Sequence, residues 1–125
     1  MLKDDFFTIS EMNIEGNSIN AFLEINEKHI IFQWYFPDHP LVPGVCIFQM
    51  LKELAELSSG QELQLTKASE IKFLGIIDPN EKKILQMNLN YEKENEGINV
   101  SASLLNDVSV CFKFKGIFKV LESVE

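Results

Sequence analysis

The chain has 125 residues, of which 46% are apolar and 24% charged, and this composition is typical of one globular domain with its own core. No apolar run approaches the ~20 residues that cross a bilayer, and the acidic residues soon after Met1 argue against a secretory signal. The net charge is -8 and every basic residue is a lysine, which argues against binding to a nucleic-acid backbone.

The two cysteines, Cys46 and Cys111, lie far apart in the sequence and inside apolar stretches. This placement predicts two buried free thiols. No spacing of cysteines or histidines suggests a metal site, so we expect no metal. A reducing cytoplasm fits this cysteine usage best.

Two strands are predicted near the start of the chain. Apolar and polar residues alternate cleanly over 18–26, which is typical of a half-buried strand. The Glu15-Gly16-Asn17 sequence can turn the chain, so residues 6–14 are expected to form the hairpin partner of that strand. His29 then falls in a surface or loop position.

Three prolines stiffen the segment between the second strand and the next element. Pro43 and Gly44 open a predicted helix over 45–57, and Ser58-Ser59-Gly60 ends it. The first turn of a helix has unpaired backbone N–H groups and the positive end of the macrodipole. Because Gly44 lacks a side chain, we expect a ligand carbonyl to approach these groups closely.

The predicted helix is apolar almost all round in its first two turns, which indicates burial on nearly every side. Its polar residues recur at spacings of three and four and form one narrow stripe. They are Gln49, Lys52, Glu53 and Glu56.

Four further strands are predicted, at 63–73, 85–91, 98–104 and 112–120, the first with imperfect alternation. Turn residues such as Asp78-Pro79-Asn80 separate them, which favours an antiparallel meander. The predicted fold class is α+β, with residues 1–125 as one domain in which a curved antiparallel sheet wraps around one central helix.

The proline-rich segment carries a family resemblance. Residues 34–49 read WYFPDHPLVPGVCIFQ, and this stretch resembles, without a gap, the pattern G-H-F-P-x-x-P-[LIVM]-x-P-G-V-x-x-x-E of the 3-hydroxyacyl-(acyl carrier protein) dehydratases. The order of the predicted elements matches that family as well. The resemblance implies the hot-dog fold and at least a homodimer, with a substrate tunnel along the interface. It also implies substrate carried on phosphopantetheine, with no other cofactor.

The resemblance assigns site residues by position. Phe36, Pro37, Pro43, Gly44 and Val45 would bind the acyl thioester of an acyl carrier protein or CoA, with amides near Gly44 and Val45 holding the thioester oxygen.

Tyr35 and Gln49 stand where the family has its catalytic histidine and glutamate. In the resembling enzymes the histidine removes the α-proton, and the carboxyl group protonates the departing hydroxyl. A tyrosine with a pKa of about 10 is ionised in roughly one molecule in a thousand at pH 7, and a glutamine has no titratable proton.

Other assignments stay open for these positions. His39 is either a substitute base or a solvent-facing residue of the loop. Gln49 faces the substrate cleft or only begins the polar stripe, and Tyr35 is a substrate contact or packs between its aromatic neighbours. Lys113, Lys115 and Lys119 form a solvated strand face or a docking stripe for a carrier protein.

Three functions are compatible with the sequence. The chain is a divergent dehydratase (a lyase) acting in fatty-acid or related synthesis, a catalytically silent carrier-binding or heteromeric partner subunit, or a hot-dog thioesterase.

Overall fold

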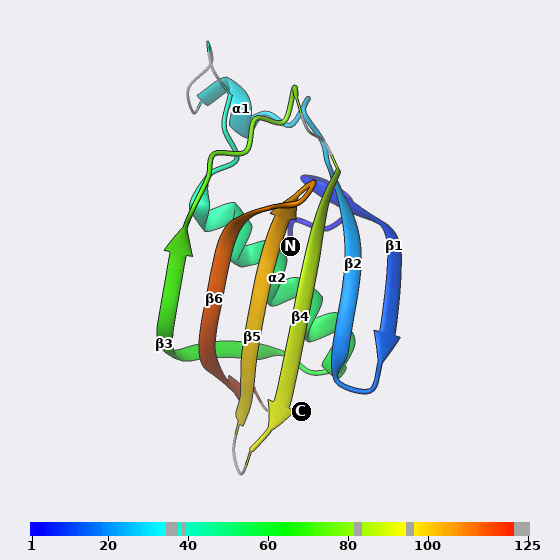
Figure 1. Ribbon diagram of the computed structural model, residues 1–125, viewed down its shortest axis with the longest axis vertical. Coiled ribbons are helices and arrows are strands. Elements are labelled where there is room, and N and C mark those ends of the chain that lie inside the picture. Colours follow the sequence, from blue (N-terminus) through cyan, green and yellow to red (C-terminus); the bar gives the residue numbers. More distant parts are fainter. Residues whose placement is uncertain (35–37, 39, 82–83, 95–96, 122–125) are drawn as a thin grey trace.

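A six-stranded antiparallel sheet curls around the long helix α2 in a computed structural model that describes residues 1–34, 38, 40–81, 84–94 and 97–121 (Figure 1). No helix within these residues is long and apolar enough to cross a membrane. The elements in chain order are β1 (Phe7–Glu15), β2 (Ser18–Ile25), α1 (Ile31–Trp34), α2 (Gly44–Ser59), β3 (Leu63–Phe73), β4 (Ile84–Lys93), β5 (Gly97–Asn106) and β6 (Ser109–Val120).

The sheet has the strand order β1-β2-β4-β5-β6-β3, and all five pairings are antiparallel. Its inner face packs on α2, which lies behind the strands in Figure 1. Successive side chains of a strand point to opposite faces of the sheet, so every second residue places an apolar side chain on this inner face. In β2 these residues are Ile19, Ala21, Leu23 and Ile25, each at most 2% exposed. The predicted α+β fold with a central helix is confirmed.

Helix α2 is buried along one face but not all round. Its C-terminus is closed by Gly60, which has φ 72° and donates its N–H to Glu56 O. The prediction that the first two turns are buried on nearly every side is wrong for Val45, which is 73% exposed. Leu57 in the last turn is also 49% exposed. A single chain has only one sheet face to cover α2, so the opposite side of the helix stays open.

The predicted meander holds for β4, β5 and β6 but is wrong for β3. β3 pairs with β6, and the segment after it passes the ends of β6 and β5 before β4 begins (Figure 1). The Asp78-Pro79-Asn80 turn therefore belongs to a crossover and not to a hairpin. Two register shifts, between Leu65 and Lys67 and between Ala68 and Glu70, explain the imperfect alternation of this strand.

The short helix α1 was not expected from the sequence. Its Phe32 is buried and packs against Phe6, with ring centroids 5.5 Å apart. His29 lies just before this helix. It accepts the N–H of Ile31 at Nδ1, and its Nε2 lies 3.1 Å from Asp5 Oδ2. His29 is thus in the predicted loop, yet its side chain is only 14% exposed and holds this turn together.

Candidate functional site

The start of α2 is fixed from outside the helix. Val42 N donates to Ile77 O at 2.9 Å, which ties the loop before α2 to the crossover after β3. Pro43 is the N-cap residue, in an extended conformation (φ -64°, ψ 144°) and with no side-chain cap. Its carbonyl accepts the N–H groups of Cys46 and Ile47.

The next two backbone amides belong to Gly44 and Val45. Within the described residues, the N–H groups of Gly44 and Val45 have no acceptor. Such N–H groups at a helix start carry the positive end of the macrodipole. They are a pair of donors that can hold a carbonyl oxygen on which negative charge develops. This is the chemistry that the sequence predicts for these two residues.

Phe73 at the end of β3 borders these amides, although the sequence did not single it out. A Cβ atom on Gly44 would lie 2.8 Å from Phe73 Cζ, so the aromatic ring fills the space beside this glycine. The missing side chain of Gly44 thus admits the Phe73 ring. The close approach of a ligand carbonyl to the amides stays a prediction. The Phe73 ring also contacts the Phe112 ring, with 5.1 Å between the ring centroids. Phe73 is nevertheless 57% exposed.

Gln49 lies further along α2 and is half-buried. Its Nε2 donates to Glu53 Oε2 at 2.9 Å. Glu53 is the one buried charged residue of the described chain, at 4% exposure, and its carboxylate also accepts Leu2 N at 2.8 Å and Lys3 N at 2.9 Å. The Gln49 side chain is thus held by a buried carboxylate that ties the N-terminal residues to α2.

Glu53 does not belong to a solvated stripe. Helical spacing places it beside Gln49, and that signal was available in the sequence. Its partners at Leu2 and Lys3 lie 51 and 50 residues away, and no local pattern predicts them. Another residue of the predicted stripe, Glu56, also has a structural role, since its Oε2 accepts Leu63 N at 2.9 Å.

The structure brings together only part of the predicted site. Pro43, Gly44 and Val45 lie at the start of α2, and Gln49 lies on the same helix. The predicted positions Tyr35, Phe36, Pro37 and His39 lie outside the described residues, so their relation to Gln49 stays a prediction. Asp38 is exposed.

Both cysteines are free and buried. Burial raises the pKa of the Cys46 thiol, which lies in the first turns of α2, and burial also raises the pKa of Cys111. Cys111 Sγ donates to Leu104 O at 3.3 Å. Neither thiol is activated as a nucleophile, since the reactive form is the thiolate. Among the described residues, no group of three or more His, Cys, Asp and Glu side chains is arranged to hold a metal ion.

A curled antiparallel sheet around one long helix is the hot-dog fold. A sequence model of the ApeI-like family, described as ApeI dehydratase, matches residues 11–111. The chain belongs to this family as a divergent member. That Tyr35 and Gln49 stand at the catalytic histidine and glutamate positions stays a prediction from the sequence pattern.

Known proteins are similar to this chain, one in sequence and two in fold. A "3-hydroxyacyl-[acyl-carrier-protein] dehydratase FabZ" from Pediococcus pentosaceus is 27% identical, over 77% of this chain and 69% of the relative. Among solved structures, "The Dehydratase Heterocomplex ApeI:P from Xenorhabdus doucetiae" has a TM-score of 0.71 at 16% identity, covering 91% of this chain and 96% of that one. A "Hypothetical Thioesterase Protein with Coenzyme A" from Streptococcus pneumoniae has a TM-score of 0.67 at 11% identity, covering 92% and 85%.

Proposed function

We propose that this chain binds 3-hydroxyacyl thioesters, carried on an acyl carrier protein or CoA, with the thioester carbonyl at the amides of Gly44 and Val45. The observation that supports this proposal is that, within the described residues, the N–H groups of Gly44 and Val45 have no acceptor at the start of a helix buried along one face. The name of the Pediococcus relative supports the substrate class. Phe73 beside Gly44 supplies an apolar surface for the first carbons of the acyl chain.

The binding proposal is tested by NMR with an acyl-pantetheine analogue whose thioester sulfur is replaced by nitrogen. We expect the backbone amide signals of Gly44 and Val45 to shift on titration, because a carbonyl oxygen accepts their hydrogen bonds. The Gly16 amide in the β1–β2 turn serves as the control and stays in place. Saturable binding that leaves both helix signals unmoved would place the ligand elsewhere and refute the proposal.

We further propose that the chain has weak dehydratase activity. A general acid or base contributes typically ~10²–10⁴-fold to a rate, and Gln49 cannot act as one because its amide neither gains nor loses a proton near neutral pH. We expect the Tyr35→His, Gln49→Glu double variant to form enoyl product at least about tenfold faster than the wild type. Product formation is followed by absorbance or mass spectrometry with a 3-hydroxyacyl carrier substrate.

Fast dehydration by the wild type would contradict this weak activity and would assign the base role to Tyr35 or His39. Loss of that activity in His39→Ala, but not in Tyr35→Phe, would then identify His39 as the base. Release of free thiol from an acyl-CoA, without enoyl product, would indicate a thioesterase instead.

A second candidate function is that of a partner subunit in a dehydratase assembly. One solved structure of the same fold is described as a dehydratase heterocomplex. In this chain β3 is an edge strand that pairs with β6 alone within the described residues, and Ile71 and Val45 are exposed nearby. These features support pairing with a second hot-dog chain, either a copy of this chain or one that retains the catalytic histidine and glutamate. Co-expression with such a chain, followed by size-exclusion chromatography, distinguishes the two assemblies.

The proposed compartment is the cytoplasm, where thiols stay reduced. The two free, buried cysteines support this placement.

A further inference from the structure

Lysines gather on the outer face of β3 and β6, the sheet face turned away from α2. Register pairing places Lys72 opposite Lys113 and Glu70 opposite Lys115, so that these side chains are neighbours on one face. Five lysines and one glutamate give this surface a net charge of 5 − 1 = +4, within a chain of net charge -8. We name it the lysine face, and it consists of Lys67, Lys72, Lys113, Lys115 and Lys119.

Ion pairs with other described residues neutralise little of the positive charge of the lysine face. Lys72 Nζ lies 3.0 Å from Glu70 Oε1, whereas Lys113 and Lys115 form no ion pair with any described residue. A hydrogen bond from Lys72 lowers the pKa of Glu70, and the charges of Lys115 and Lys113 lower it further. The face is therefore a region of positive potential that attracts an anionic partner.

The lysine face borders a hollow of about 300 Å³ with a polar surface. Lys113, Lys115 and Glu70 line this hollow together with Ala102, Phe114 and four hydroxyl and amide side chains of β4 and β5. These four are Asn88, Asn90, Ser101 and Ser103.

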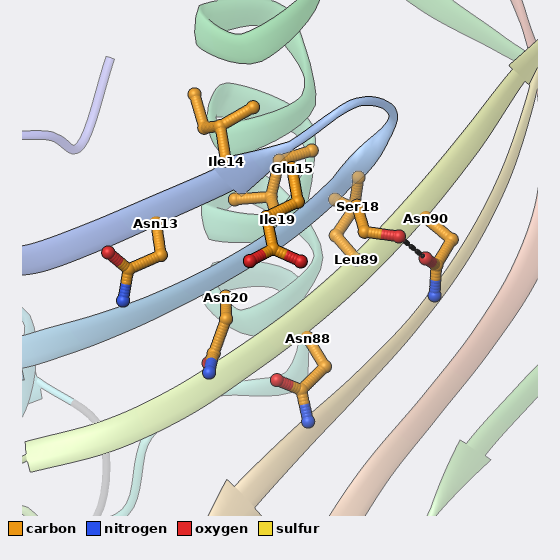
Figure 2. A pocket seen from close by; sticks show the side chains of 9 residues that line it. All are labelled: Asn13, Ile14, Glu15, Ser18, Ile19, Asn20, Asn88, Leu89 and Asn90. Atoms are coloured by element: carbon orange, nitrogen blue, oxygen red, sulfur yellow. Dashed lines mark hydrogen bonds between the residues drawn. The ribbon is translucent and has the colours of Figure 1, made fainter.

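The hollow continues towards the other edge of the sheet. Asn88 and Asn90 also line a second hollow of about 500 Å³ over β1, β2 and β4 (Figure 2). Figure 2 shows Asn13, Asn20 and Asn88 on these three neighbouring strands. The outer face thus offers a polar depression with positive charge at one end.

One end of the lysine face lies next to the proposed thioester site. Lys72 precedes Phe73 and Lys113 follows Phe112, and the two phenylalanine rings are 5.1 Å apart. Phe73 in turn contacts Gly44 at the start of α2. A partner held by these lysines would therefore lie beside the start of the helix that receives the thioester.

From the charge and position of the lysine face, together with the proposed function, we infer that this face is the docking surface for the acidic acyl carrier protein. A carrier protein with an acidic surface would be complementary to a face of net charge +4. The lysines of β6 lie between positions 113 and 119, which are six residue steps or roughly 20 Å of strand apart. That length suits the side of a protein helix better than the phosphates of one CoA, and in β6 no outward-facing aromatic side chain is available to stack on an adenine.

Direct binding measurements test the docking surface. The wild type, a Lys113→Glu, Lys115→Glu variant, and a Lys28→Glu, Lys93→Glu control are titrated with holo-acyl carrier protein, with acyl-pantetheine and with acyl-CoA. The control has the same change in net charge at exposed lysines outside β3 and β6. We expect the Lys113→Glu, Lys115→Glu variant to raise the Kd for the carrier by about tenfold or more, and wild-type binding to weaken with added salt. Its Kd for acyl-pantetheine should stay within about twofold of the wild-type value, and the control should bind the carrier as the wild type does.

The inference is overturned if the wild type does not bind the carrier, if the two double variants weaken carrier binding equally, or if the loss is as large for acyl-CoA as for the carrier. The last result would mean that the lysines bind CoA phosphates. The proposed function fails separately. If carrier binding depends on Lys113 and Lys115 but acyl-pantetheine does not bind, the docking surface stands and the thioester site does not.

Discussion

The carboxylate of Glu53 lies in the interior of the protein, where an isolated charge is costly. The protein offsets that cost with three hydrogen bonds, from Leu2 N, Lys3 N and Gln49 Nε2. Hydrogen bonds that involve an ionised group are stronger than neutral ones. The residue is thus a structural anchor between α2 and the start of the chain.

Replacing Glu53 with alanine is expected to lower the free energy of unfolding by about 1–3 kcal/mol, because the three donors lose their acceptor. Urea unfolding followed by circular dichroism measures the change. Glu92→Ala, at an exposed position on β4, is the matched control and should stay within about 0.5 kcal/mol of the wild type. Equal stability of the two variants would contradict the anchoring role.

Gln49→Glu alone should make stability depend on pH. The new carboxyl group would lie at hydrogen-bond distance from the Glu53 carboxylate, since the present contact is 2.9 Å. A like charge disfavours ionisation, so we expect the pKa of the introduced group to be raised in the folded state. The folded state then binds more protons than the unfolded one, and stability falls as pH rises through the raised pKa.

Thermal unfolding of Gln49→Glu from pH 4 to pH 8 checks this expectation. The difference in Tm from the wild type should be smallest at low pH and grow as pH increases. A constant difference over this range would mean that the two side chains are not in contact.

At the scale of single elements, the pairing of β3 with β6 depends on a close approach at Gly116. A Cβ atom there would lie 2.7 Å from Lys67 O and 2.6 Å from Phe114 Cζ. This contact falls between the two bulges that bend β3. The absence of a side chain at position 116 therefore lets the two strands approach at the bend.

Gly116→Ala is expected to destabilise the fold by about 1–3 kcal/mol, the usual cost of forcing a methyl group into a packed site. Ser101→Ala, on the exposed face of the neighbouring β5, tests whether the effect is specific and should change stability by less than about 0.5 kcal/mol. Chemical denaturation of both variants gives the comparison. A neutral Gly116→Ala would show that the backbone shifts without strain.

At the scale of the whole molecule, one side of the structure is incomplete as a single chain. Ile71 and Phe73 belong to the inner face of β3 by register, yet they are 49% and 57% exposed, and Val45 on α2 is 73% exposed. An edge strand with exposed apolar side chains is a ready surface for association. We therefore expect pairing between two copies through this side.

Ile71→Glu should convert a dimer into monomers, because it places a charge in the expected interface. Multi-angle light scattering after size-exclusion chromatography measures the molecular mass. Val108→Glu, at the turn between β5 and β6 where Val108 is 92% exposed, should leave the assembly unchanged. A monomeric wild type, or a dimer that survives Ile71→Glu, would rule out this interface.

The sequence predicted the architecture well because alternation in β2 and β4–β6 and the proline-rich entry to α2 are local signals. The position of β3 was missed, since its partner strand follows β4 and β5 in the chain and no local pattern encodes that pairing. The structural role of Glu53 was missed for the same reason, because its carboxylate accepts the N–H groups of Leu2 and Lys3, which lie 51 and 50 residues away in the chain. At the candidate site, the role of the Gly44 and Val45 amides in holding a thioester stays a prediction, although these N–H groups have no acceptor among the described residues. The Phe73 contact was missed because it depends on that same long-range topology.

Because a crossover separates β3 from β4, the pairing of β3 is delayed while the chain is being translated. Ser109 begins β6 a full 36 residues after Phe73 ends β3, so the ribosome must translate β4 and β5 before β3 can find its strand partner. Nascent chains grow at about 5–20 residues per second, which leaves β3 without that partner for a few seconds. Chaperones that capture apolar nascent segments would have this interval in which to act, and a stop codon before β6 would leave β3 permanently unpaired.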